Sequence, residues 1–138
     1  EKDFIEVYKK ELFETPNIKM YGRIDPTTTE FKKIADMCAS TIHPSSSEGT
    51  SGAVIQAMHT GLVPIITPET GIDPDAGGII LENPTPELIK KTITEFSLTP
   101  THEVESLARK AWSFVAQNHT RENFSKKYSE FIDTILKL

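Results

Sequence analysis

The sequence is poor in cysteine, in basic residues and in long apolar runs. Its single cysteine, Cys38, can form no disulfide within the chain, which fits a reducing compartment and predicts a cytoplasmic protein. The 15 Lys and Arg residues are outnumbered by 20 Asp and Glu residues, so the formal net charge is -5. Nucleic acids and anionic membranes bind clustered cations, so this balance argues against a nucleic-acid partner. No apolar run approaches ~20 residues, and no transmembrane segment is predicted.

Helical and strand patterns alternate along the chain. Apolar residues recur at helical spacing in six stretches: 3–14, 27–38, 52–60, 86–96, 101–117 and 121–135. Short apolar runs predict four strands: 17–21, 40–43, 62–67 and 78–82. This order indicates an α/β domain with a mostly parallel sheet and a helical C-terminal tail over about 101–138. A length of 138 residues allows one domain at most.

Several residues have the chemistry of helix ends. The Thr27–Glu30 spacing is that of a capping box, and Thr85 and Thr120 stand where N-caps are expected. Gly61 follows the helix over 52–60 as a C-terminal cap. Cys38 falls on the apolar face of its helix, so we expect it in the core.

The stretch 44–61, PSSSEGTSGAVIQAMHTG, combines a loop of small residues, one carboxylate and an apolar helix. The helix is apolar almost all round, which predicts a buried helix whose N-terminus opens onto the loop. Free N–H groups and the helix dipole favour an anion at such a place. In parallel sheets ligands bind beyond the carboxyl ends of the strands, and the loops after 40–43 and 62–67 both leave such ends.

These residues resemble the signature of the glycosyl transferases group 1 family. The family pattern has Pro-Ser, a Glu, a Gly-rich turn, a second Glu eight residues after the first, Ala-Met, Gly, Pro and an apolar strand. The matching positions here are Pro44, Ser45, Glu48, Gly49, Gln56, Ala57, Met58, Gly61, Pro64, Ile65 and Ile66. Upstream, NIKMYG and the later AS-TIHP also match, so the resemblance covers about residues 11–138.

The resemblance implies a retaining enzyme of GT-B fold that uses a nucleotide-sugar donor without a cofactor or an obligatory metal. The chain would be an incomplete C-terminal donor-binding domain with a Rossmann-like, three-layer parallel sheet. Glu48 would be the catalytic-site carboxylate that accepts hydrogen bonds from sugar hydroxyls. The candidate donor-binding residues are Gly49, Thr50, Ser51, Gly52, Gln56, Gly22, Arg23, Ile24, Ser45 and His43.

Two departures from the family pattern stand out. The second Glu, which binds the ribose diol in the family, is Gln56 here, and the loss of a charge-assisted hydrogen bond is worth about tenfold in donor affinity. In the family, two strands supply the Arg and Lys that contact the diphosphate, and nothing in residues 1–16 matches them. The family's N-terminal acceptor domain is also missing from the chain. We therefore expect a fragment of a larger transferase that closes its sheet differently or pairs with a second copy as a homodimer. A carbohydrate or lipid-linked acceptor would bind the missing N-terminal domain, and peripheral membrane association of the full-length protein is left open.

Other interpretations of the same residues remain open. The protein could be an inactive GT-B-like binding or assembly module, with Gln56 marking lost catalysis, or a nucleotide-sugar epimerase. Glu48 could be a plain surface carboxylate, and His43 a satisfied, partly buried imidazole. Gln56 could be a structural amide, and Arg23 could face solvent rather than the diphosphate or base.

Overall fold

The structure, a computed structural model, describes residues 2–137 and divides into two compact units between Phe31 and Lys32. The first unit contains α1 (Lys2–Val7) and α2 (Lys9–Glu14). The sequence predicts one helix here, but the chain turns at Tyr8, where φ is -104° and ψ is 23°. The rings of Phe4 and Tyr8 still lie 4.7 Å apart across the turn.

The strand expected at 17–21 is absent, which corrects the prediction of four strands. These residues form a turn and an extended segment, and no described strand pairs with them. Ile18, Met20 and Tyr21 are exposed, so the alternation that suggested a buried face has nothing to cover. An extended segment without a ladder partner gains none of the main-chain hydrogen bonds that define a strand.

An N-cap at Thr27 would start the next helix at residue 28, but α3 (Thr29–Ala35) begins one residue later. The hydroxyl of Thr28 accepts from the N–H of Phe31 at 3.3 Å, whereas Thr27 bonds the Asp25 carboxylate. The helix ends at Ala35, so Cys38 lies beyond its last turn. Cys38 is exposed, and its expected place in the core is wrong.

Three parallel strands form the sheet, in the order β1-β2-β3: β1 (Ser40–His43), β2 (Val63–Ile66) and β3 (Ile79–Ile80). All three were predicted, although β2 and β3 are shorter than expected. His43 pairs with Ile66 and Ile65 pairs with Ile79. Strand β2 is buried along its whole length, as its continuous apolar run predicts.

Pro64 is tolerated inside the central strand because its nitrogen points toward β3, and β3 pairs with β2 only after this residue. Val63 donates to Ala39 at 3.1 Å on the β1 side, so the nitrogen of Pro64 points toward β3. Pairing with β3 begins only at Ile65. Gly78 lies opposite, where a Cβ would come within 2.9 Å of Pro64 Cγ. The missing N–H therefore leaves no ladder bond unmade.

Helices connect the three strands and continue the chain after β3. They are α4 (Gly52–His59), the 3-10 helices η1 (Pro68–Thr70) and η2 (Pro74–Ala76), α5 (Pro86–Ser97), α6 (Thr101–Asn118) and α7 (Arg121–Leu136). Thr85 accepts from Leu88 and Thr120 from Asn123, which confirms both expected N-caps. No helix among residues 2–137 is long and apolar enough to cross a bilayer.

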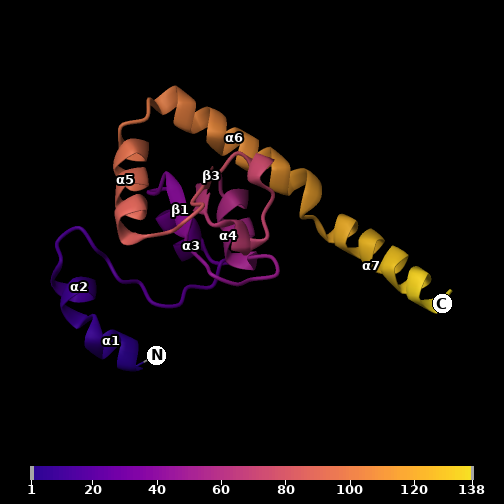
Figure 1. Ribbon diagram of the computed structural model, residues 1–138, viewed down its shortest axis with the longest axis horizontal. Coiled ribbons are helices and arrows are strands. Elements are labelled where there is room, and N and C mark those ends of the chain that lie inside the picture. The colour runs from indigo at the N-terminus through magenta and orange to yellow at the C-terminus, as the bar shows by residue number, and fades with distance from the viewer. Residues whose placement is uncertain (1, 138) are drawn as a thin grey trace. The chain divides into compact units, whose positions relative to one another are not determined.

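Figure 1 shows α6 running past α4 and α7 continuing beyond it. Helix α6 contributes to the core, whereas α7 exposes its apolar face. The main buried cluster joins α4, β2, the loop after β2 and α6 through Val54, Met58, Ile66, Ile72, Ala76, Ala111 and Val115. The two helices expected as one tail thus have different roles: α6 packs on α4 and β2, and α7 leaves Phe124, Tyr128 and Phe131 exposed.

Candidate functional site

A histidine and a carboxylate meet at the carboxyl end of β1. His43 is the last residue of the strand, and its Nε2 lies 2.9 Å from Oε1 of Glu48 in the loop before α4. About a third of each side chain remains exposed, 33% and 32%. The pair is therefore held by the fold and still open to a ligand.

Hydrogen bonding favours the ionised form of Glu48. The His43 side chain lowers the pKa of Glu48 most, and the Ser51 hydroxyl lowers it further. A carboxylate only accepts, so Nε2 of His43 carries the hydrogen that joins them. About a third of the carboxylate side chain stays exposed beside these two partners, so it can also accept from a ligand hydroxyl.

The same geometry argues against a serine nucleophile. The hydroxyl of the buried Ser51 lies 3.5 Å from Nε2 of His43. This is the same ring nitrogen that faces Glu48. A relay of serine, histidine and acid uses the two ring nitrogens separately, one for each partner. Ser51 is therefore arranged as part of the Glu48 surroundings, and not as an attacking group.

The loop after β2 braces the loop after β1. Thr67 donates its hydroxyl to the carbonyl of Ser45 at 2.5 Å. The N–H of Glu48 donates to the carbonyl of Glu69, and that of Ser51 to Thr70, each at 3.0 Å. Ser51 and Thr70 are both buried, so the bond between them is shielded from water. The expectation that both loops share one edge of the sheet is confirmed.

Gly71 completes this brace by close approach. Its φ is 67°, and a Cβ there would lie 2.0 Å from the carbonyl oxygen of Gly49. Only glycine fits such a position without moving the neighbouring backbone. The first loop is thus packed, backbone on backbone, against the second.

Helix α4 starts at this braced loop. Its N-cap, Ser51, makes no side-chain capping bond, so the first-turn N–H groups stay available. Gly52 and Gln56 are exposed and lie one turn apart on the same face. Ala53 is exposed as well, so the expectation of burial all round is wrong: the helix buries only the side that carries Val54 and Met58.

A Schellman motif ends α4, as the sequence predicts for Gly61. Gly61, with φ 85°, donates to the carbonyl of Met58 and Leu62 to that of Ala57. Leu62 and Ala57 also share a small buried cluster with Ala35.

The structure brings together a subset of the expected site residues. Around the N-terminus of α4 it gathers His43, Glu48, Gly49, Thr50, Ser51, Gly52 and Gln56. Within this group the hydroxyl of Thr50 donates to Gly49. Ser45 has a structural part instead, since its carbonyl accepts from Thr67 and its hydroxyl from the N–H of Ser47. No described residue bonds the exposed Gln56 amide, so nothing supports a satisfied structural amide.

Gly22, Arg23 and Ile24 belong to the other unit. Gly22 has a positive φ of 71°, Arg23 is exposed and Ile24 is half-buried. Their place beside the nucleotide base stays a prediction.

Sequence reasoning missed the bracing residues Thr67, Glu69, Thr70 and Gly71. The available signal was the position of the second loop, which leaves the strand next to β1. Through residues 2–137, no group of three or more His, Cys, Asp or Glu side chains is close enough to hold a metal ion.

The chain matches no protein-family model, and a comparison with curated proteins likewise finds no match.

Proposed function

We propose that this chain is the donor-binding part of a retaining glycosyltransferase of GT-B type. The complete reaction moves a sugar from a nucleoside diphosphate to an acceptor hydroxyl and releases the nucleoside diphosphate and a proton. The acceptor would bind a domain outside residues 1–138. The observation that carries the proposal is the position of Glu48, oriented by His43 beside the N-terminus of α4.

Each part of this arrangement suits a sugar diphosphate. The partly exposed carboxylate of Glu48 accepts from sugar hydroxyls, and the lowered pKa keeps it ionised. The first-turn N–H groups of α4 and its dipole stabilise negative charge on the diphosphate as the sugar leaves. Gln56, exposed one turn further along, would meet the ribose.

Calorimetric titration with UDP-, GDP- and ADP-sugars tests the proposal, with the protein as it occurs in the cell. Glu48→Gln should weaken donor binding about tenfold or more, since charged hydrogen bonds are worth about 1.5–3 kcal/mol. Glu69→Gln is the matched control, because it removes the same charge from the bracing loop, where only the backbone of Glu69 is bonded. Equal affinities for the parent protein and Glu48→Gln would overturn the assignment.

A second candidate is a GT-B-like binding or assembly module without transferase activity. The observation in its favour is an amide at Gln56 where the signature has a carboxylate. Gln56→Glu separates the two: in a transferase it should strengthen donor binding by up to about tenfold. A protein that binds none of the donors, with or without this change, is a module.

A further inference from the structure

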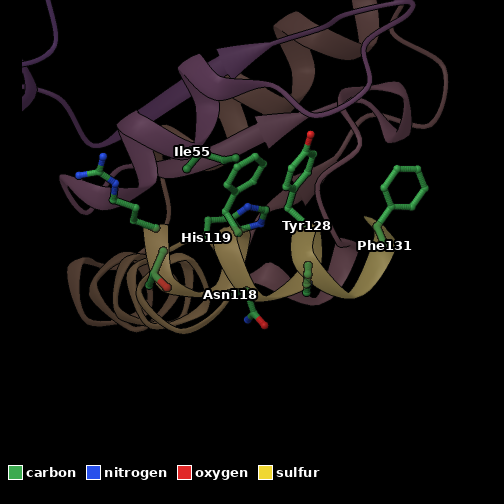
Figure 2. Close-up of a pocket in the computed structure, with 9 residues that line it drawn as sticks. Ile55, Asn118, His119, Tyr128 and Phe131 are labelled. Atoms are coloured by element: carbon green, nitrogen blue, oxygen red, sulfur yellow. The ribbon is translucent and has the colours of Figure 1, made fainter. Parts of the chain in front are cut away.

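A second concave surface lies between α4 and the start of α7. It is an open groove of about 600 Å³, with Ile55 on one side and residues of the α6–α7 corner and α7 on the other. Its lining consists of Ile55, Asn118, His119, Thr120, Arg121, Phe124, Lys127, Tyr128 and Phe131. Figure 2 shows His119, Tyr128 and Phe131 extending toward the side where Ile55 lies, and Asn118 pointing the other way. All of these residues belong to one compact unit.

Aromatic rings form a large part of the α7 side of the groove. Phe124, Tyr128 and Phe131 are 68%, 55% and 58% exposed, although they sit on one face of α7. The rings of Phe124 and Tyr128 are nearly parallel, with centroids 5.8 Å apart and an interplanar angle of 15°. Contiguous exposed rings of this kind mark binding surfaces.

The charge of the groove is of one sign. Arg121 and Lys127 are cations, His119 adds a ring nitrogen, and no acidic side chain is among the described residues that line it. Burial lowers the pKa of His119 most, and the nearby charges of Lys127 and His59 lower it further. This concentration of basic groups occurs in a chain whose net charge is -5.

We propose that this groove binds a small amphiphilic anion dissolved as a monomer. The apolar part would lie against the three aromatic rings and Ile55, and the phosphate or carboxylate between Arg121, Lys127 and His119. The charge of the lining selects against cations, and the volume is that of a small-molecule site. The inference is independent of the Glu48 site.

Methyl NMR with dodecyl phosphate, below its micelle concentration, tests the groove. The Ile55 methyl signals should shift saturably, whereas those of Ile135, on α7 but outside the lining, should not. Dodecylammonium, with the same chain and the opposite charge, should bind at least tenfold more weakly. Equal affinity for the two probes, or no binding of dodecyl phosphate, would overturn the proposal.

Neighbouring lysines provide a matched pair of variants. Lys127→Met should weaken dodecyl phosphate binding at least threefold, and Lys126→Met, outside the lining, should leave it unchanged. Phe124→Ala should weaken both probes, with circular dichroism verifying that the helices persist. Equal losses in the two lysine variants contradict the proposal. So does a dimer, seen by sedimentation, that closes the groove to the probe, or binding only to phosphatidylglycerol vesicles.

Discussion

Nε2 of His43 lies 2.9 Å from Oε1 of Glu48, so the last residue of β1 is joined directly to the loop that leads into α4. The loop after β2 holds the backbone of Glu48, and this bond holds its side chain. The strand end therefore fixes the direction of the carboxylate at the candidate donor site.

Replacing His43 by Phe should raise the pKa of Glu48 toward its ordinary value, because the largest cause of the lowering is removed. The folded-state pKa lies below the unfolded value of about 4.3. The pair therefore stabilises the fold above that pH, and the stabilisation is lost as the pH falls through the lowered folded-state pKa. Carboxyl ¹³C NMR measures the titration. Asp25, whose pKa is lowered by Thr27, is the internal control and should titrate as before. An unchanged pKa of Glu48 would show that His43 does not stabilise the carboxylate.

Thr67→Val should lower the free energy of unfolding by about 1–3 kcal/mol, since it keeps the shape of a buried side chain and removes its hydroxyl. The carbonyl of Ser45 would lose its partner. Urea denaturation measures the effect. Thr67→Ser retains the hydroxyl and should preserve the loop contact; a loss in Thr67→Val no larger than that of Thr67→Ser would show that the bond is unimportant.

Gly71→Ala should destabilise the protein more than Gly61→Ala. Both glycines have positive φ, which costs about 1–2 kcal/mol for alanine, but only at Gly71 would the new Cβ meet backbone, the Gly49 carbonyl. The difference in unfolding free energy isolates the contact between the loops. Amide chemical shifts over 48–51 should move in Gly71→Ala alone; unaltered shifts there would show that the loops are independent.

Val115→Ala should cost about 1–3 kcal/mol, because Val115 is fully buried in the cluster that joins α6 to α4. Gln117→Ala, at an exposed position of the same helix, should stay within about 0.5 kcal/mol of the parent. Thermal or chemical unfolding compares the two. Similar small losses would mean that α6 is a loosely attached tail.

Local signals in the sequence predict local structure well. Thr85, Thr120 and Gly61 specify their helix ends through bonds to residues within five positions, and all three act as expected. The continuous apolar run over β2 likewise predicts burial of both faces of the strand, and the whole strand is buried.

Predictions failed where a partner far along the chain decides the outcome. The segment 17–21 alternates like a strand, but no strand within residues 2–137 pairs with it. The apolar face of α7 likewise has no described element packed against it to bury Phe124. The pairing of Thr67 with Ser45 spans 22 positions and leaves no periodic pattern in the sequence. The signature residues around Glu48 could be named from sequence, whereas their bracing could not.

The brace from the second loop bears on how strongly any ligand could bind at α4. A loop of serines and glycines on its own samples many conformations, and ordering it on binding would weaken affinity through lost conformational entropy. Here the bonds to Glu69 and Thr70 order the loop during folding. The second loop thus sets part of the entropy change of binding at the first, and Thr67→Val or Gly71→Ala, unlike Glu69→Gln, should weaken ligand affinity through lost preorganisation.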